Sequence, residues 1–531
     1  MSLLPGGGAT RFRRFVAGIA LALVLAPAVA RAQPGPAGAA ERADPAAGTA
    51  ARETPATVAT AHRLTLPDRV LAYTARAGVL PVRRAPRQPE AEIFYVAYTL
   101  DDADARRRPV SFLFNGGPGA ASVFLHLGGI GPRRLALNAD GTWPPAPVGL
   151  SDNPLTWLAF TDLVFVDPVG TGYSVVPEAG PDDGKEADKG KASDFWGVER
   201  DLDSLGEFIR LYLTRNDRWL SPKVVVGESY GGFRVAALAQ RLPEKFDIAP
   251  NGAILISPLM EYAMLGGNRY NLLPWALTLP SLAATAAWHD RGSLAAAASQ
   301  DLEATLAPVE DFALSEMLVG LADEDAAAVY AAIAAFAGLP EGFVAARRGR
   351  IGTGAFAKQL LRDQERLVGR YDGTISGPDP HPDEADFEGG DPSFDFLTTA
   401  YAPALIAHLR GELDFRTDAA YELINRDVGR RWDFSDALPQ RRQGFAGFSE
   451  ALREGLILNP GLSVLITHGY HDLITPYLAS RYLVAQMDLP AEAAGRVRLA
   501  NFTGGHMFYL RQSSLEALHE AAASFFAGLA G

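Results

Sequence analysis

The sequence lacks cysteine, is short of basic residues and has no apolar run of bilayer-spanning length. The absence of cysteine among 531 residues excludes disulfides, thiolate metal ligands and cysteine nucleophiles. The 49 Lys and Arg against 62 Asp and Glu give a formal net charge of -13. We therefore expect no nucleic-acid partner, because phosphate binding requires clustered basic side chains. Hydrophobic residues make up 48% of the chain, which allows a large buried core and excludes a disordered chain.

The N-terminal segment has the three parts of a secretory signal peptide. A basic stretch ending at Arg14 precedes the apolar run FVAGIALALVLAPAVA, and an Ala-x-Ala site ends at Ala32. A membrane anchor is the alternative, but the run is shorter than the ~20 residues of a bilayer span, and Pro27 interrupts it. We expect cleavage of residues 1–32, no stable membrane anchor afterwards, and a bacterial periplasmic or secreted location, which suits a chain without disulfides.

The pattern along the chain predicts an α/β fold with a mostly parallel sheet covered by helices on both faces. Residues 33–61 are rich in Ala, Pro, Gly and Thr, and we expect a flexible linker there. From residue 62 onward, helical patterns alternate with short apolar runs that are typical of strands buried on both faces. These runs are 110–115, 162–167, 223–228, 253–257 and 463–468. The core is therefore expected to comprise residues 62–257 and 446–531.

Between residues 258 and 445 the strand pattern gives way to helical stretches. This range is too long for a loop. We expect a mainly helical insertion over the C-terminal edge of the sheet, where ligands bind in open α/β folds. The acidic, turn-rich stretch Pro378–Asp391 suggests a calcium loop, but its spacing does not match an EF-hand. A solvated surface loop is the favoured interpretation.

The stretch VVVGESYGGF (224–233) predicts a nucleophilic serine. A Gly-x-Ser-x-Gly sequence between a strand and a helix forms a sharp turn that exposes the serine hydroxyl above the sheet edge. By itself the pattern also marks ordinary turns. Here an apolar strand precedes it and a helical pattern follows it, so we identify Ser229 as the candidate nucleophile.

A serine nucleophile requires a histidine base and an acid that orients the base. In α/β-hydrolases the chain order is serine, acid, histidine, and Asp472 and His506 each follow a predicted strand in that order. Taken singly, Asp472 is also typical of a helix N-cap, and His506 is also typical of a buried packing residue. His468 and His471 suggest a metal site, but no carboxylate–histidine set at ligand spacing supports one. We expect no metal.

The stretch LFNGGPGAAS (113–122) is the candidate for half of an oxyanion hole. Its glycines allow the backbone to approach a substrate closely, and the negative charge of a tetrahedral intermediate requires preorganised donors. We assign the backbone N–H groups of Gly117 and Tyr230 to this role. A plain Gly-Pro turn is the alternative, but it does not account for the preceding Asn-Gly-Gly.

Several of these stretches together resemble the serine carboxypeptidase family, the group of carboxypeptidase Y and cathepsin A. The similar stretches are FNGGPGAAS, NPLTWLAFTDLVFVDPVGTGYSV, VVVGESYGGFRV, HGYHDLITP and GGHM, in family order over about residues 110 to 510. The resemblance implies an α/β-hydrolase fold with a helical cap and the triad Ser229, Asp472 and His506. It implies no cofactor.

The resemblance also implies a pocket for the substrate's C-terminal carboxylate. The matching residues are Asn115, the Gly116 N–H and Glu228, and Glu228 would be protonated when it meets the substrate. Peptide hydrolysis would then favour mildly acid pH. A structural, salt-bridged carboxylate is the alternative interpretation of Glu228.

Two departures from the family pattern bear on specificity. The family has a second glutamate at the position of Gly129, and its cysteine after Gly-Gly-Pro-Gly is Ala120 here. His126 would share a helix face with position 129 and is a possible replacement donor, although a packing role is the more common one.

We therefore expect an exported serine carboxypeptidase that hydrolyses the C-terminal bond of peptides through an acyl-enzyme. An esterase or acyltransferase on the same scaffold is the alternative, favoured by Gly129, because fold alone does not decide the chemistry. A catalytically silent peptide-binding protein is the third possibility, and the complete triad disfavours it. The aromatic residues Trp157, Tyr173 and Trp275 are candidates for pocket lining, although aromatic residues more often pack in cores.

Overall fold

The computed structural model describes most of the chain from residue 57 onward. The described ranges are 57–83, 90–176, 192–297, 301–323, 326–387, 390–434 and 446–529, all within one compact unit, Glu53–Gly531. The predicted signal peptide, residues 1–32, and most of the predicted linker lie outside the described residues. Strand β1 (Val58–Thr65) begins before residue 61, so the predicted end of the linker is wrong. The Val, Ala and Thr residues of β1 have a composition typical of linkers, but they pair with the neighbouring strand β2.

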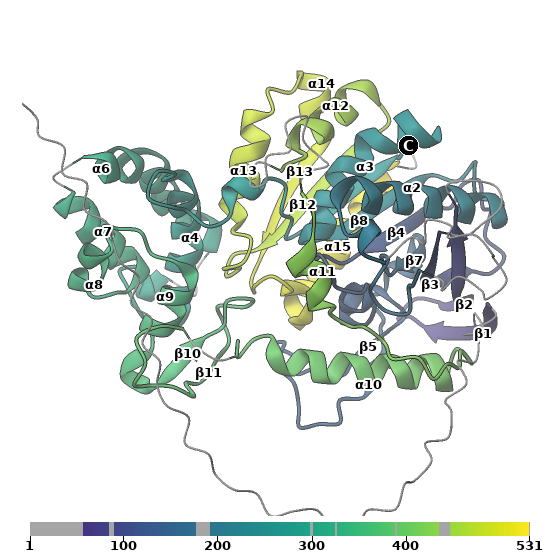
Figure 1. The fold of residues 1–531 in the computed structure, drawn as a ribbon, viewed down its shortest axis with the longest axis horizontal. Helices are drawn as coiled ribbons and strands as arrows, with labels where there is room; N and C mark the ends of the chain where they lie inside the picture. Colours follow the sequence, from purple (N-terminus) through teal and green to yellow (C-terminus); the bar gives the residue numbers. More distant parts are fainter. Residues whose placement is uncertain are drawn as a thin grey trace, which may run out of the picture. The chain divides into compact units, whose positions relative to one another are not determined.

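A nine-stranded sheet forms the centre of the fold, in the order β1-β2-β3-β7-β4-β8-β9-β12-β13 (Figure 1). Strands β1 to β3 pair antiparallel and β3 pairs antiparallel with β7, whereas β7 to β13 pair in parallel. The other strands are β2 (Val70–Val82), β3 (Ala91–Leu100), β4 (Val110–Phe114), β7 (Asp162–Val166), β8 (Lys223–Glu228), β9 (Gly252–Ile256), β12 (Ser463–Gly469) and β13 (Val497–Phe502). This confirms the predicted mostly parallel α/β sheet and identifies an α/β-hydrolase fold.

The parallel strands are buried on both faces, as their continuous apolar runs predict. In β4, Phe112 and Phe114 pack into one apolar cluster, whereas Leu113 packs into the cluster on the opposite face. Alternate residues of β8 divide between the two clusters in the same way. The sheet therefore supplies a rigid double-sided core whose carboxyl edge positions the loops that follow each strand.

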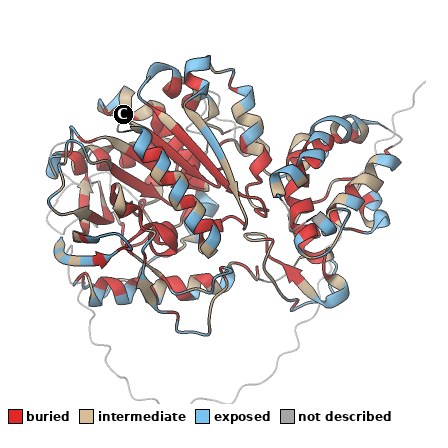
Figure 2. Cartoon of the chain, turned by 180° about the vertical axis from the view of Figure 1, so that it is seen from behind, coloured by how far each residue is buried: buried red, intermediate tan, exposed pale blue. Residues whose placement is uncertain are grey.

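Helices cover both faces of the sheet, and each presents a buried stripe to it (Figure 2). On one face lie α2 (Val198–Arg215), α3 (Tyr230–Phe246) and α12 (Ser449–Leu458). The other face is covered by α10 (Asp395–Gly411) and α15 (Gln512–Leu529). The shorter elements are α1 (Val123–Leu125), α11 (Arg426–Arg431), α13 (Tyr477–Gln486), α14 (Ala491–Ala494) and the pair β5 (Arg133–Leu135) and β6 (Leu150–Asp152). None of the helices that the structure describes combines the length and apolar character of a bilayer span.

The range 258–445 forms two different kinds of structure. Its first part has a separate apolar cluster that extends to Tyr470 and Leu478 of the core. The helices of this part are α4 (Leu273–Trp288), α5 (Leu302–Phe312), α6 (Leu318–Ala322), α7 (Ala327–Ala337), α8 (Glu341–Ala346) and α9 (Thr353–Gln359), followed by the pair β10 (Arg366–Val368) and β11 (Ser376–Pro378). No described residue of this range belongs to a strand of the nine-stranded sheet.

The later part of the same range packs with the core. Leu397, Tyr401 and Leu405 of α10 belong to the apolar cluster on one face of the sheet, so α10 is a core helix.

The stretch Pro378–Asp391, predicted to be a solvated surface loop, is only partly exposed to solvent. Asp379 is buried and pairs with Lys358 at 2.6 Å, and buried Asp391 accepts the Arg370 N–H at 2.9 Å.

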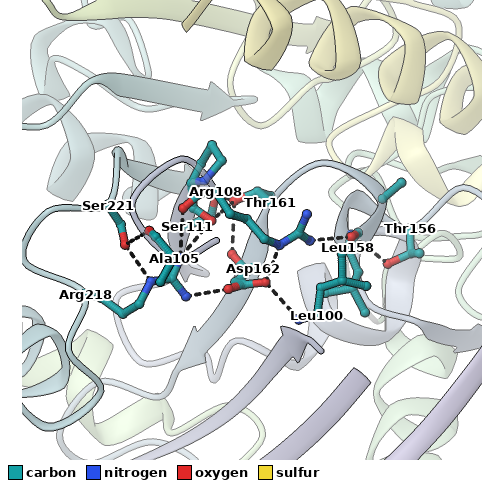
Figure 3. A network of polar contacts seen from close by, with 12 residues as sticks. Leu100, Ala105, Arg108, Ser111, Thr156, Leu158, Thr161, Asp162, Arg218 and Ser221 are labelled. Carbon is teal, nitrogen blue, oxygen red and sulfur yellow. Dashed lines mark hydrogen bonds and ion pairs between the residues drawn. The ribbon is translucent and has the colours of Figure 1, made fainter. Parts of the chain in front are cut away.

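A buried charge network fastens the amino ends of the central strands (Figure 3). Asp162, the first residue of β7, pairs with Arg218 and also accepts Arg108 Nε at 2.6 Å and the Leu100 N–H at 3.0 Å. Arg218 Nε in turn donates to Ser221 Oγ at 2.6 Å. Because this network lies at the amino edge of the sheet, it leaves the carboxyl edge to the candidate catalytic residues.

Candidate active site

Ser229 forms the turn between strand β8 and helix α3. It has φ 61° and ψ -121°, a conformation that is rare for a residue with a side chain and that costs backbone energy. The Ser229 N–H donates to the Ile256 carbonyl at 3.0 Å, and the Leu259 N–H donates to the Ser229 carbonyl at 3.0 Å. Ser229 is half-buried between the buried residues Glu228 and Tyr230. This is the strand–turn–helix geometry that presents a serine nucleophile.

The glycines that flank Ser229 are required by close backbone contacts. A Cβ on Gly227 would lie 2.0 Å from the Gly231 carbonyl oxygen, and a Cβ on Gly231 would lie 2.4 Å from the Phe114 carbonyl oxygen. Both contacts are far shorter than real Cβ contacts. The Gly-x-Ser-x-Gly pattern therefore follows from the tight packing of α3 against β8 and β4.

Asp472 lies in the loop after β12 and is fully buried. Its Oδ1 accepts the backbone N–H groups of Ile474 at 2.8 Å and Thr475 at 2.9 Å. Its Oδ2 accepts the Thr475 hydroxyl at 2.8 Å and lies 2.8 Å from His506 Nδ1. Donors on both oxygens hold the carboxylate in one orientation toward the imidazole.

His506 follows β13 and is also buried. Its N–H donates to the Tyr371 carbonyl at 2.5 Å, and its own carbonyl accepts the Ser257 hydroxyl at 2.8 Å. Burial opposes protonation of the imidazole, but the charge and hydrogen bond of Asp472, and then the charge of Glu228, outweigh burial and raise the pKa of His506. Because Asp472 engages Nδ1, Nε2 is the nitrogen that remains for Ser229.

The contacts recorded among the described residues include no hydrogen bond between Ser229 Oγ and His506. Such hydrogen bonds are often long in substrate-free enzymes and shorten in the reacting complex. The structure thus brings Asp472 and His506 into direct contact and places Ser229 on the same sheet edge.

The two candidate oxyanion donors lie on adjoining loops. Gly117 has φ 103°, which favours glycine. A Cβ on the preceding Gly116 would lie 2.5 Å from the Tyr230 nitrogen and 2.8 Å from Ser229 Cβ, so this loop is in close backbone contact with the turn. The Tyr230 N–H is the first of α3, where helix N–H groups have no partner within the helix and attract negative charge.

Glu228 is buried and faces Asn115. Asn115 Nδ2 donates to Glu228 Oε2 at 3.1 Å, and the hydroxyl of Tyr509 donates to the same oxygen. Burial raises the pKa of Glu228 to about 7, against the opposing effects of His506 and of these two donors. No salt bridge of Glu228 is recorded among the described residues, so the structural-carboxylate alternative has no ion pair to support it.

Arg234 of α3 contacts the backbone carbonyl of Asn115. Its Nε and NH2 donate to the two oxygens of Asp201 at 2.7 and 3.1 Å, and its NH1 donates to the Asn115 carbonyl at 2.7 Å. Arg234 and Asp201 are 1% and 3% exposed. This buried bidentate pair links helix α2 to the loop that follows β4.

The run Asp167–Ser174, which composition alone does not explain, also fastens that loop. Asp167 Oδ1 accepts the backbone N–H and the hydroxyl of Ser122, each at 2.8 Å, and its Oδ2 accepts the Tyr421 hydroxyl at 2.9 Å. Burial raises the pKa of Asp167 to about 6 despite these donors. The carboxyl end of β7 thereby holds the candidate oxyanion loop.

Three other histidines considered from the sequence bond or pack with residues outside the candidate triad. His126 Nε2 lies 2.6 Å from Tyr98 Oη, and that hydroxyl lies 2.8 Å from His408 Nε2, so Tyr98 and not Glu228 is the partner of His126. His468 Nε2 lies 2.8 Å from Ser480 Oγ, and buried His471 packs against the Trp288 ring. The described residues contain no group of three or more His, Asp or Glu placed to hold a metal ion.

The three candidate pocket aromatics differ in placement. Trp157 and Tyr173 are buried in the core. Trp275 lines a hollow of about 220 Å³ that adjoins the acid loop at Leu473 and Ile474. Of the three, Trp275 alone borders open space next to a candidate catalytic loop.

Sequence reasoning missed the tertiary supports of the site, chiefly Thr475, Tyr371 and Tyr509. Thr475 Oγ1 contacts both Asp472 Oδ2 and, at 3.0 Å, His506 Nδ1. The Tyr371 ring packs edge-on against the His506 ring at 5.5 Å. Thr475, three positions after Asp472, was within reach of local reasoning, whereas Tyr371 and Tyr509 meet the site only through the fold.

Part of the chain is similar to a known protein family. Residues 69–256 match the serine carboxypeptidase family. The pheromone-processing carboxypeptidase KEX1 of Saccharomyces cerevisiae is 33% identical over 167 residues, 29% of this chain and 20% of that protein. Serine carboxypeptidase 3 of Hordeum vulgare is 26% identical over 161 residues, 30% of this chain and 27% of that protein. These matches span less than a third of the length of either relative. The family match over residues 69–256 includes Ser229 but not Asp472 or His506.

Two of the solved structures to which this chain is similar are hydrolases of low sequence identity. The peroxisomal alpha-beta-hydrolase Lpx1 of Saccharomyces cerevisiae has a TM-score of 0.34 and 11% identity, with 90% of each chain covered. A carboxyl esterase of Bacillus coagulans has a TM-score of 0.35 and 10% identity, with 86% of this chain and 99% of that chain covered. The fold assignment rests on the sheet topology described above.

Proposed function

We propose that this chain is a hydrolase that removes C-terminal residues from peptides, a proposal that its match to the serine carboxypeptidase family over residues 69–256 supports. The contact that most strongly supports a hydrolytic triad is the 2.8 Å approach of His506 Nδ1 to Asp472 Oδ2 on the sheet edge that carries Ser229. Peptide specificity is supported by Glu228 and Asn115, which form a buried hydrogen-bonded pair next to the nucleophile.

The proposed reaction proceeds through an acyl-enzyme. Ser229 Oγ attacks the carbonyl carbon of the last peptide bond while His506 Nε2 accepts the hydroxyl proton. The N–H groups of Gly117 and Tyr230 stabilise the negative oxygen of the tetrahedral intermediate. When the C–N bond breaks, His506 returns the proton to the leaving amine. Water then attacks the ester by the same route and regenerates Ser229.

The two titrating groups set the working pH. His506 must be neutral to accept a proton, and Glu228 must be protonated to donate a hydrogen bond to the substrate carboxylate. The acid limb of the pH profile should therefore follow His506, whose pKa is raised, and the alkaline limb should follow Glu228, whose pKa is about 7. A bound carboxylate raises the pKa of Glu228 further, because two negative charges cannot share the pocket cheaply. The pH range of peptide hydrolysis therefore extends further toward alkaline pH.

We also propose that the protein acts outside the cytoplasm. This rests on the basic, apolar and Ala-x-Ala segments before Gln33 and on the absence of cysteine. Mass spectrometry of the protein purified from a bacterial periplasmic fraction would test it, and the expected N-terminal residue is Gln33.

The direct test of the proposed function is product analysis. Incubation of the protein with a peptide of mixed sequence, followed by mass spectrometry, should show a ladder of products shortened from the C-terminus only. The matched reaction uses the same peptide with a C-terminal amide, which should remain intact. Internal cleavage, or loss of residues from the N-terminus, would contradict the proposal.

A further inference from the structure

Glu228 has a buried partner that the triad does not use. Tyr509 lies in the short helix η9 (Phe508–Leu510), shortly after His506, and is fully buried. Its hydroxyl donates to Glu228 Oε2, the oxygen that also accepts Asn115 Nδ2 at 3.1 Å. With two donors on Oε2, a proton on Glu228 resides on Oε1 and is available as a donor.

The ring of Tyr509 fills the space next to Gly128 and Gly129. A Cβ on Gly128 would lie 2.6 Å from Tyr509 Cε2, and a Cβ on Gly129 would lie 3.6 Å from Tyr509 Cδ2. The same Cβ on Gly129 would lie 2.6 Å from Leu515 Cδ1. A side chain at position 129 therefore does not fit unless Leu515 moves. The group that borders Glu228 on this side is the phenol of Tyr509.

A phenol differs from a carboxyl group in how it titrates. Burial, and then the negative charge of Glu228, hold the pKa of Tyr509 well above its ordinary value. Tyr509 thus remains a hydrogen-bond donor throughout the range in which Glu228 gains and loses its proton. The charge on this side of Glu228 therefore changes with the proton of Glu228 and not with Tyr509, while His506 and Asp472 are the other charged groups that act on Glu228.

We propose that Tyr509 is a positioning residue that makes Glu228 the sole ionisable donor for a substrate carboxylate. The inference rests on the proposed function and adds a further residue to its carboxylate-recognition site. Tyr509 and Asn115 fix one oxygen of Glu228, and the other oxygen presents the proton to the substrate.

The test compares Tyr509→Phe with Tyr401→Phe. Tyr401 is equally buried, and its hydroxyl has no recorded hydrogen-bond partner. With an N-blocked dipeptide, Tyr509→Phe should raise KM about tenfold and move the alkaline limb of kcat/KM about one pH unit upward, since a hydrogen bond that favoured the charged form of Glu228 is lost. Tyr401→Phe should hydrolyse both the dipeptide and p-nitrophenyl acetate within about twofold of the unmodified protein, whereas the loss in Tyr509→Phe should be larger for the dipeptide than for p-nitrophenyl acetate, which has no carboxylate.

Two outcomes of the kinetic comparison would overturn the inference. One is an unchanged pH profile and KM in Tyr509→Phe. The other is a loss of affinity for the dipeptide confined to Tyr401→Phe, which would assign the second donor to Tyr401.

A second measurement separates this inference from the proposed function. Carbon NMR titration of glutamate-labelled protein, with the Glu228 signal assigned through Glu228→Gln, should show a higher pKa of Glu228 in Tyr509→Phe. If the unmodified protein cleaves no dipeptide, the proposed function fails while this titration still decides the role of Tyr509. An unshifted Glu228 signal would overturn that role.

Discussion

Ser229→Ala should lower kcat/KM for peptide hydrolysis by at least about 10⁴-fold, because it removes the only atom that forms the acyl-enzyme. The fold should be unaffected, since alanine adopts the same turn between β8 and α3 and the turn is held by backbone hydrogen bonds to Ile256 and Leu259. Steady-state kinetics together with thermal unfolding would check both parts. A variant that unfolds at the same temperature and retains activity would contradict the assignment.

Two further variants sharpen that result. Ser111→Ala removes a buried serine hydroxyl near the amino end of β4, where it contacts Thr161 Oγ1 at 2.8 Å, and it should retain activity within about twofold. The double variant Ser229→Ala/His506→Ala should be no less active than Ser229→Ala alone, because residues that act as a unit are not additive. Multiplicative losses would mean that Ser229 and His506 act independently.

Arg234→Met should destabilise the protein by about 3–5 kcal/mol, because it leaves the buried carboxylate of Asp201 without its partner. The matched control is Arg241→Met on the same helix. Arg241 pairs with Glu199 and with Asp203, whose side chains are 36% and 33% exposed, so its loss should cost about 1 kcal/mol or less. Urea unfolding at neutral pH measures both.

The pH dependence of the Arg234→Met deficit has a definite sign. Burial already raises the pKa of Asp201 against the opposing effect of Arg234, and removal of the arginine raises it further. The free-energy cost of burying the charged form of Asp201 is therefore fully present above the pKa that Asp201 has in the folded variant. This cost shrinks as the pH falls through that pKa. Equal losses in the two arginine variants, or a deficit that grows on acidification, would show that Asp201 is not an uncompensated buried charge.

The sequence was sufficient to predict the parallel strands and to select the residues of the candidate triad. Apolar runs bounded by turn residues predicted β4, β7, β8, β9 and β12, and the Gly-x-Ser-x-Gly pattern located the sharp turn at Ser229. The order of Asp472 and His506 after later strands was enough to expect both at one sheet edge, since parallel strands all end there. The structure places the two at hydrogen-bond distance.

What the sequence did not predict depends on contacts between distant segments. Helix α10 lies within the range that was expected to form a helical insertion, and nothing in its sequence indicates that it packs on the sheet instead of the helices of that insertion. Strand β1 carries Ala and Thr at alternating positions, a weak pattern that composition alone assigns to a linker. Tyr509 contacts Glu228 across 281 positions, a contact that no local pattern indicates.

The most direct test of the central claim is the ratio of kcat/KM for one N-blocked dipeptide with a free C-terminal carboxylate to that for its C-terminal amide, measured from pH 5 to pH 9. Both substrates require neutral His506, so the ratio removes its titration and isolates Glu228. With the pKa of Glu228 at about 7, the ratio should be about 100-fold at low pH, fall as pH rises through the Glu228 titration, and become independent of pH in Glu228→Gln. Equal cleavage of the two substrates at every pH would contradict recognition of the carboxylate and would support an esterase or acyltransferase.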